Sequence, residues 1–152
     1  GTGSDLLSSG GGNDILIGGA GDDLLLAGAG NDDARGSAGD DTILAGAGND
    51  VITGGSGDDV LFGGSGSDIF VFGAGDGADQ IFDYETPRAG RVITVAGDRI
   101  ALSFDGVDSF EQLLGLAQEQ DGGVLFDFGN GDELFLRGTQ LSALDRNTFT
   151  FT

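Results

Sequence analysis

The 152-residue chain has no cysteine, histidine, methionine or tryptophan, and Pro87 is its single proline. Without cysteine it forms no disulfide and offers no thiolate ligand. Without histidine or cysteine it cannot build a nucleophile–histidine pair or a histidine zinc site. Its six basic residues are all arginine, so a Walker A phosphate loop, which needs a lysine, is excluded as well. We therefore expect this chain not to be an enzyme.

Long apolar runs are also missing. No stretch approaches the roughly 18 apolar residues that a membrane-spanning helix needs. No N-terminal secretion signal is present either. Because Gly1 stands partway through a repeat, we expect the chain to be a fragment of a longer protein.

Basic residues are scarce beside the acids: 26 acidic residues face six arginines, for a formal charge of −20. Such a chain is a poor partner for nucleic acid or for an anionic membrane surface. Of the acids, 22 are aspartate and only four are glutamate. An excess of the shorter acid favours carboxylates held close to the backbone, as in hard-cation sites made of carboxylates and carbonyls. Paired carboxylates can also hydrolyse glycosides, but the repeat described next accounts for these.

Glycine is abundant, with 32 residues, and it follows a fixed period of nine over residues 1–71. Each unit has glycine at its fourth position, aspartate at its sixth and, with one alanine exception, a large apolar residue at its eighth. The aspartates are Asp5, Asp14, Asp23, Asp32, Asp41, Asp50, Asp59 and Asp68. A period of nine with a single proline excludes collagen, and regular apolar positions argue against disorder. The glycines therefore serve backbone geometry.

Each unit predicts a six-residue turn and a three-residue strand, such as Ile15–Ile17, whose central side chain faces the core. One such face cannot bury itself alone, so the units must stack. The residue before the aspartate alternates between Asn and Asp in the middle units. Two units therefore form one coil of 18 residues, with two strands and two turns.

Stacked coils predict two rows of aspartates, at a spacing of about 4.8 Å. One row holds Asp5, Asp23, Asp41 and Asp59, and the other holds Asp14, Asp32, Asp50 and Asp68. Asp79, 20 residues after Asp59, is the next candidate for the first row; the alternative is a solvated residue of a cap. Carboxylates this close repel unless cations lie between them. Ca²⁺ suits the gap, because it accepts about six to eight oxygens in flexible geometry, whereas Mg²⁺ demands an octahedron.

The pattern Gly-Gly-x-Gly-x-Asp-x-apolar-x resembles the RTX nonapeptide. The resemblance implies a right-handed parallel β-roll in which aspartates and turn carbonyls of neighbouring coils share each Ca²⁺ ion. One ion in each interval of the two rows gives about seven ions. The weakest unit is 27–35, where Asp33, Ala34 and Arg35 replace an apolar strand. The turn carbonyls expected to take part lie near Gly10, Gly12, Gly19, Gly21, Gly28, Gly30, Gly39, Gly46, Gly48, Gly55, Gly57, Gly64 and Gly66.

After Val71 the register breaks, and we divide the chain into a β-roll over 1–80 and a small α+β cap over 81–152. The cap pattern predicts short strands at Val92–Val95 and Ile100–Leu102. Ser109 with Gln112 forms a capping box for one short helix with an apolar stripe of Phe110, Leu113, Leu114 and Ala117. Strands Val124–Phe128 and Leu134–Leu136 flank a Gly-Asn-Gly hairpin turn, and a last edge strand holds Phe149 and Phe151.

Three segments, 79–84, 98–102 and 126–132, are similar to the tail that follows the repeats in serralysin-type proteases. In that family the C-terminal region carries an uncleaved signal for type I secretion, so the likeness implies a cap combined with an export signal. The alternative is a cap alone. The resemblance thus implies a secreted, extracellular bacterial protein whose partners are calcium, an upstream domain of the same polypeptide and the type I secretion machinery.

The outer face of one coil side is unusually apolar, and its residues are Leu24, Leu26, Leu44, Val60 and Phe62. Large apolar patches are usually covered, which favours docking of another domain or of the cap. We therefore expect a calcium-binding module that folds on binding extracellular Ca²⁺ and supports export and stability of a larger secreted protein. The alternative is an adhesin-like accessory module for a polysaccharide or a surface, in which calcium only holds the scaffold.

Overall fold

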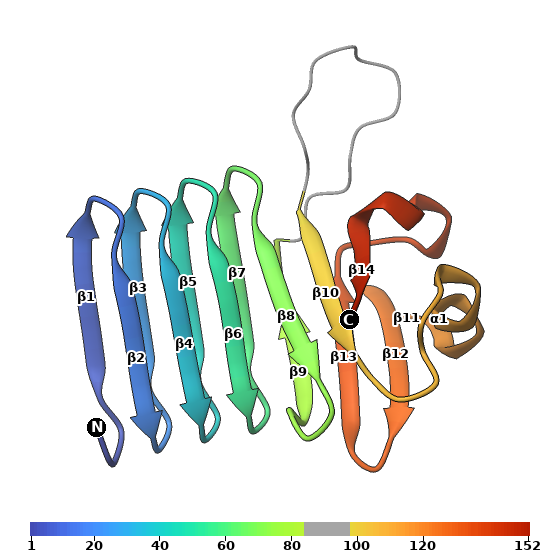
Figure 1. The fold of residues 1–152 in the computed structure, drawn as a ribbon, viewed down its shortest axis with the longest axis horizontal. Helices are drawn as coiled ribbons and strands as arrows, with labels where there is room; N and C mark the ends of the chain where they lie inside the picture. Colours follow the sequence, from blue (N-terminus) through green and yellow to red (C-terminus); the bar gives the residue numbers. More distant parts are fainter. Residues whose placement is uncertain (84–97) are drawn as a thin grey trace.

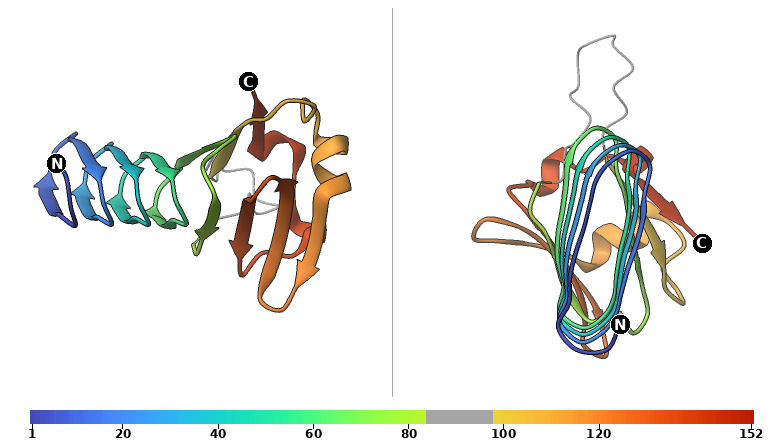
Figure 2. Two further views of the ribbon diagram at one scale, coloured as in Figure 1. Left: turned by 90° about the horizontal axis from the view of Figure 1, so that it is seen from below. Right: turned by 90° about the vertical axis from the view of Figure 1, so that its left-hand side faces the viewer.

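The computed structural model describes residues 1–83 and 98–152. These residues form a mainly β structure: a parallel β-solenoid with coils of 18 residues, then a C-terminal part with one short helix (Figure 1). The fold class predicted from the repeat is thereby confirmed. Each coil contributes one strand to each of two sheets, and the coils superimpose as flattened rings when viewed along the stack (Figure 2).

The two sheets of the roll are named here sheet 1 and sheet 2. Sheet 1 contains β1 (Leu6–Gly11), β3 (Leu24–Ala29), β5 (Thr42–Ala47), β7 (Val60–Ser65) and β9 (Ala78–Ile81). Sheet 2 contains β2 (Ile15–Ala20), β4 (Asp33–Ala38), β6 (Val51–Ser56) and β8 (Ile69–Gly73). Neighbouring strands of the roll pair in parallel, and up to β8 their partners lie 18 residues apart, as in Leu7 with Leu25.

The strands are longer than the three residues predicted, since each of β1 to β7 has six. In β3 the apolar triplet continues into Ala27–Ala29, where Gly28 pairs with Gly10 on one side and Gly46 on the other. Parallel stacking gives the backbone of this glycine-rich half its hydrogen-bond partners without any help from side chains. Only the last three residues of each unit's turn lie outside the strands.

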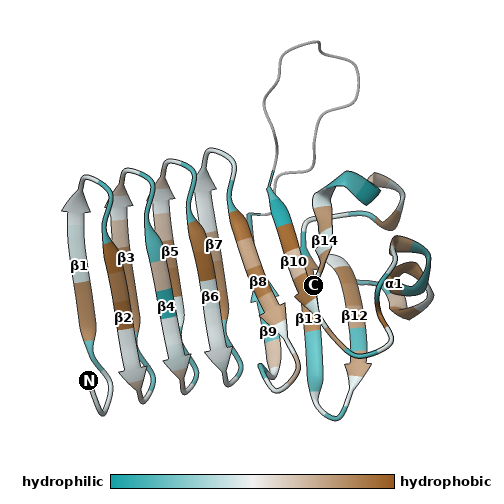
Figure 3. Ribbon diagram, in the orientation of Figure 1, coloured by the Kyte–Doolittle hydropathy of each residue, from teal (hydrophilic) through white to brown (hydrophobic). Residues whose placement is uncertain are grey.

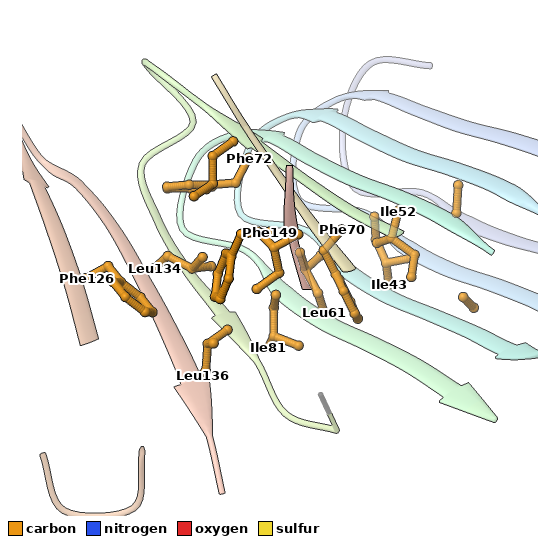
Figure 4. Close-up of a cluster of buried hydrophobic side chains, with 14 of the residues drawn as sticks. Ile43, Ile52, Leu61, Phe70, Phe72, Ile81, Phe126, Leu134, Leu136 and Phe149 are labelled. Carbon is orange, nitrogen blue, oxygen red and sulfur yellow. The ribbon is translucent and has the colours of Figure 1, made fainter. Parts of the chain in front are cut away.

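The core is one column of side chains between the two sheets. Leu25, Ile43 and Leu61 of sheet 1 meet Ile52 and Phe70 of sheet 2, and all are buried (Figure 4). The column thins at Ala34, as the weak unit predicted, although Ala34 itself is fully buried. Its neighbours Asp33 and Arg35 form an ion pair of 2.6 Å outside the core and give β4 a hydrophilic stretch (Figure 3).

The C-terminal part contains α1 (Phe110–Leu116), and Ser109 caps it by accepting from the Gln112 amide, as the capping box predicted. Ala117 lies outside this helix because its backbone is extended and begins a strand. The remaining elements are β10 (Arg99–Ser103), β11 (Ala117–Gln120), β12 (Gly123–Gly129), β13 (Asp132–Arg137), two 3-10 turns (Leu141–Ala143 and Arg146–Thr148) and β14 (Phe149–Phe151). The predicted hairpin and last strand are present, each within two residues of its expected bounds. The strand predicted at Val92–Val95 lies outside the described residues.

Both sheets continue from the roll into the C-terminal part, which lies at the end of the stack (Figure 2). In sheet 1, β9 pairs with β7 and with β13, and the β12–β13 hairpin extends the sheet. In sheet 2, β10 pairs in parallel with β8 and with β14. The strand edges of the last coil are therefore paired, which is what a cap must achieve. The division at residue 80 stays a prediction.

No helix among the described residues has the length and apolar character needed to cross a membrane.

Candidate metal centre

The repeat aspartates stand at the turns, each directly before a strand. Asp23 precedes β3 and Asp32 precedes β4. Strands within a sheet point the same way, and the two sheets point in opposite directions (Figure 1). The aspartates before sheet 1 therefore line one edge of the roll and those before sheet 2 line the other. The structure brings the predicted residues into two rows.

Within each row, one carboxylate oxygen is held by the coil before it. The backbone N–H of Asp5 donates to Oδ1 of Asp23 at 2.7 Å, and the N–H of Asp14 donates to Oδ1 of Asp32 at 2.8 Å. The same bond recurs at each step up to the Asp50–Asp68 pair, at 2.7–3.0 Å. Asp79 takes the corresponding bond from Asp59 at 3.1 Å, although 20 residues separate them. Asp79 therefore occupies the next place in the first row.

The second oxygen of these carboxylates has no hydrogen-bond partner. Oδ2 is buried and unbonded in Asp14, Asp23, Asp32, Asp41, Asp50, Asp59, Asp68 and Asp79. Asp5, in the first coil, is different: its side chain is 45% exposed and lies 3.7 Å from the N-terminal amine. A buried carboxylate oxygen without a donor or a cation carries a large desolvation cost. The two rows thus present a regular set of oxygens that need positive charge.

Backbone carbonyl oxygens of the next coil lie close to some of these Oδ2 atoms. A Cβ added to Gly18 would collide with Oδ2 of Asp23 and lie 2.8 Å from the Gly36 carbonyl oxygen. One coil later, a Cβ at Gly36 would collide with Oδ2 of Asp41 and lie 2.6 Å from the Gly54 carbonyl oxygen. The absence of a side chain at the first position of these units leaves a cradle lined by a carboxylate and by a carbonyl of the next coil.

The carbonyls of Gly36 and Gly54 were not among those predicted. Several predicted carbonyls point instead toward the matching glycine of the next coil, where an added Cβ would meet them: those of Gly10, Gly12, Gly21, Gly28, Gly30, Gly39, Gly46, Gly48 and Gly57. Because backbones stack this closely, a side chain at those positions would force the coils apart. A role of these carbonyls as ligands stays a prediction.

Burial and mutual repulsion raise the pKa of five row carboxylates in the later coils. Burial, opposed by the hydrogen bond from Asp41, raises the pKa of Asp59 to about 7, and nearby Asp41 adds to the rise. The pKa of Asp79 rises to about 8, first through burial and then through Asp59. The pKa of Asp68 rises to about 6, again mainly through burial. Burial also raises the pKa of Asp41 and Asp50. Burial thus makes the charged form of these groups costlier than it is in water.

A second polar ladder runs beside each row, at the residue before the aspartate. Oδ1 of Asn31 accepts from the Asn49 amide at 2.8 Å, and Oδ1 of Asp40 accepts from the Asp58 amide at 2.9 Å. These side chains are exposed and accept from the following coil, whereas the row aspartates accept from the preceding one. The Asn–Asp alternation read from the sequence thus belongs to two separate exposed ladders, one on each edge.

Three aspartates outside the repeat have related positions, and the nine-residue pattern missed them. Asp98 is buried, and its Oδ1 accepts from the Asp68 amide at 3.0 Å. The Asp83 carboxylate accepts from the amides of Gly63 and Gly64, and Asp132 accepts from the amides of Gly75 and Gly77. All three lie in the segments that are similar to the serralysin-type tail, and Asp98-Arg99-Ile100 and Asp132-Glu133-Leu134 also repeat the Asp-x-apolar spacing.

The residues present fit calcium. Among the described residues, no three acidic side chains converge into a metal cluster, so a site here must take backbone oxygens as well as carboxylates. Ca²⁺ accepts such mixed oxygen ligands at about 2.3–2.6 Å, and thiolate or imidazole metals find no ligands in this chain. The unbonded Oδ2 atoms and the glycine cradles lie where such an ion would be shared between coils.

Comparison with known proteins agrees with this geometry. Residues 1–34 and 35–70 match the family described as RTX calcium-binding nonapeptide repeat (4 copies). No curated protein matches the chain in sequence.

Among solved structures, the extracellular lipase LipA from Serratia marcescens matches 99% of this chain, with a TM-score of 0.53 and 17% identity. The chain spans 38% of that lipase. The AlgE6R2 subunit of the Azotobacter vinelandii mannuronan C5-epimerase matches 95% of this chain and 91% of its own, with a TM-score of 0.56 and 22% identity. The AlgE6R3 subunit of the same epimerase matches 93% of this chain and 80% of its own, with a TM-score of 0.47 and 24% identity. The lipase and AlgE6R2 likenesses show a shared fold.

Proposed function

Since residues 1–70 consist of RTX calcium-binding nonapeptide repeats folded as a β-roll, we propose that the chain folds on binding extracellular Ca²⁺ and supports the export and stability of a larger secreted protein. The observation that carries this proposal is the row of buried, unbonded Oδ2 atoms, which recurs from coil to coil. Such atoms are costly in a folded chain and become favourable only when a cation joins them.

In this proposal the ligands are the row aspartates together with turn carbonyls. The first row, from Asp5 to Asp79, has five carboxylates and four gaps between them. The second row, from Asp14 to Asp68, has four carboxylates and three gaps. One ion in each gap makes about seven Ca²⁺ ions. The AlgE6 and LipA likenesses support the coil geometry and leave the number of ions to experiment.

Charge makes folding depend on calcium. The chain carries a formal charge of −20, and glycine makes up 32 of its residues, so both repulsion and chain entropy oppose the compact state. About seven divalent ions would supply +14, which offsets most of that charge. Calcium that binds only the folded chain adds its binding free energy to folding. Extracellular calcium modules typically bind at about 10⁻⁴–10⁻³ M, so the chain would stay unfolded inside a cell and fold outside it.

Calcium-dependent folding also suggests how the protein is exported. An unfolded chain suits passage through a narrow type I exporter, and the repeat and the fold shared with an extracellular lipase support a secreted bacterial protein. Residues 1–80 would form the calcium-binding roll, and 81–152 would cap it and carry the export signal. The upstream part of the polypeptide would hold the catalytic or binding activity, and this chain would itself be non-catalytic.

A calcium titration followed by far-ultraviolet circular dichroism tests the proposal. We expect the strand signal to appear with calcium, to disappear with EDTA, and to be absent at equal concentrations of Mg²⁺. A strand signal that EDTA leaves unchanged would refute the switch, and equal folding in Mg²⁺ would refute calcium selectivity.

A second candidate function, polysaccharide binding, is favoured by one feature of sheet 1. On its outer face Phe62 stacks on Phe82 with ring centroids 5.0 Å apart, and the Arg137 guanidinium lies 4.7 Å above the Phe82 ring. Arg137 also donates to Gln80, beside a shallow pocket of about 400 Å³. Aromatic faces with polar neighbours are what a sugar ring needs.

A glycan array at saturating calcium separates this candidate from the first. Reproducible binding that is lost in Phe82→Ala and kept in Leu114→Ala, an exposed apolar residue on α1, would support it. No binding by the folded chain would exclude it.

A further inference from the structure

Asp98 stands where the next aspartate of the second row belongs, although 30 residues rather than 18 separate it from Asp68. Its Oδ1 accepts from the Asp68 amide at 3.0 Å, as Asp68 accepts from Asp50. The amide of Arg99 donates to the Asp68 carbonyl at 2.7 Å, as the amide of Ile69 donates to the Asp50 carbonyl at 2.8 Å. The two hydrogen bonds that join successive row aspartates within the repeat, one to the carboxylate and one to the backbone carbonyl, are therefore both present between Asp68 and Asp98. Asp98 is 1% exposed.

Asp68, the lower carboxylate of this pair, has one unbonded oxygen. Oδ2 of Asp68 is buried and accepts no hydrogen bond, and Asp68 is 1% exposed. A Cβ added to Gly63 would collide with this Oδ2, so the atom lies inside the turn that Gly63 begins. The Asp83 carboxylate holds that turn in place, since it accepts from the amides of Gly63 and Gly64 at 2.8 Å each. The last turn of the repeat is thus held by a carboxylate from the chain that follows it.

We propose that one further calcium ion binds between Asp68 and Asp98, at the junction of the roll and the C-terminal part, and that this ion controls docking of the C-terminal strand. Asp68 and Asp98 supply the carboxylates, backbone oxygens of the turn over residues 63–68 complete the site, and Asp83 positions that turn. The inference rests on the proposed function. It adds Asp98 to the second row as a fifth carboxylate, beyond the end of the repeats. The total then rises from about seven ions to about eight.

The link from this ion to the C-terminus runs through β10. Asp98 directly precedes β10, which pairs with β8 on one side and with β14 on the other. Ile100 pairs with Phe149 and Leu102 with Phe151, and the Thr152 amide donates to the Leu102 carbonyl at 3.0 Å. An ion that holds Asp98 against Asp68 also holds the start of β10 beside β8. The other edge of β10 is then in place for β14 to pair with it. Without the ion, like charges on Asp68 and Asp98 oppose that contact.

The competing explanation is that Asp98 only accepts a hydrogen bond from the end of the roll. Asp98→Asn separates the two, because asparagine keeps an oxygen for the Asp68 amide and removes the charge that a cation needs. Asp105→Asn is the matched control, since Asp105 is exposed in the connection after β10. Two readouts apply: calcium ions counted by native mass spectrometry, and hydrogen exchange of β3 and β14 during a calcium titration.

We expect Asp98→Asn to bind one ion fewer than the unmodified chain and to leave β14 exchanging as fast as without calcium, while β3 becomes protected. Asp105→Asn should match the unmodified chain in both readouts. An unchanged ion count in Asp98→Asn, or calcium-protected β14 in that variant, would overturn the proposal. If calcium protects neither strand of the unmodified chain, the proposed function itself fails, and the two failures are thereby distinguished.

Should Asp98→Asn fail to fold, Asp98→Glu replaces it. Glutamate keeps the charge and moves it by one methylene, so the junction site should weaken while the other sites stay unchanged. The calcium midpoint for β14 protection should then rise about tenfold above that for β3, because ligand charge and placement set calcium affinity. Equal midpoints for the two strands would overturn the proposal.

Discussion

Replacing Asp41 by alanine removes a carboxylate that lies between two coils of the first row. The Asp23 amide donates to Oδ1 of Asp41, and the Asp41 amide donates to Oδ1 of Asp59, both at 2.7 Å. Asp41 therefore borders two of the proposed ion gaps. Asp5 borders one, at the exposed end of the row. The two substitutions should differ in calcium and only in calcium.

The size of the difference follows from binding. An ion held at about 100 times its dissociation constant contributes about 2.7 kcal/mol to stability. If Asp41→Ala empties two gaps, it loses about 5 kcal/mol in saturating calcium, whereas Asp5→Ala loses at most about 3 kcal/mol. In calcium-free buffer near neutral pH the unmodified chain and both variants should be unfolded, so the difference between the two substitutions should disappear.

Urea denaturation at saturating calcium measures the two losses, and circular dichroism after calcium removal checks that the three chains are equally unfolded. Asp105→Ala, an exposed acid outside the rows, controls for the loss of one negative charge. Equal losses for Asp41→Ala and Asp5→Ala in calcium would refute ions shared between neighbouring coils. A strand signal that persists in the calcium-free unmodified chain and is lost in Asp41→Ala would show that the carboxylate serves hydrogen bonding to the Asp23 amide rather than cation binding.

Three further predictions follow from single positions. Ser37 has a φ of +94° where most other units have glycine, so Ser37→Gly should stabilise the calcium-bound roll by about 0.5–1 kcal/mol in urea denaturation; a loss would contradict this. Gly36→Ala places a methyl group in the cradle of Asp41, so it should lower the ion count in native mass spectrometry, and an unchanged count would exclude that cradle. The pKa of Asp59 rises to about 7 and that of Asp79 to about 8, against about 3.9 when unfolded. Between pH 4 and 8 the calcium-free folded chain then binds more protons than the unfolded chain, so its stability falls as pH rises. In calcium-stripped buffer, the dichroism signal should be stronger at pH 5 than at pH 8, and the reverse order would contradict the burial of these groups.

Much of the roll could be predicted because each position of the nine-residue unit has its own residue type and its own place in the coil. The period of nine places Asp23 and Asp41 in one row and Leu25 and Ile43 in one core column, and the structure does the same. The six-residue strands could not be predicted from side chains. Their second half pairs through glycine-rich backbone, which carries no apolar pattern.

Asp98 was missed for a different reason. The 30 residues that separate it from Asp68 break the period of nine, and the local Asp-x-apolar spacing at Asp98-Arg99-Ile100 does not by itself say which strand lies beside it. Two coils stack because their strands pair in space. A longer connection between the strands increases the number of residues between two stacked aspartates, but it leaves the strand pairing unchanged. The Gly36 and Gly54 carbonyls were missed because a backbone oxygen leaves no mark in a sequence.

The central claim is that calcium lies in two rows between the coils, and a crystal structure of the calcium-bound chain with anomalous scattering tests it most directly. We expect peaks along both edges of the roll, each between the Oδ2 atoms of successive row aspartates such as Asp23 and Asp41. Peaks confined to the exposed ladder of Asp22, Asp40 and Asp58, or no ordered peaks along the rows, would contradict the account.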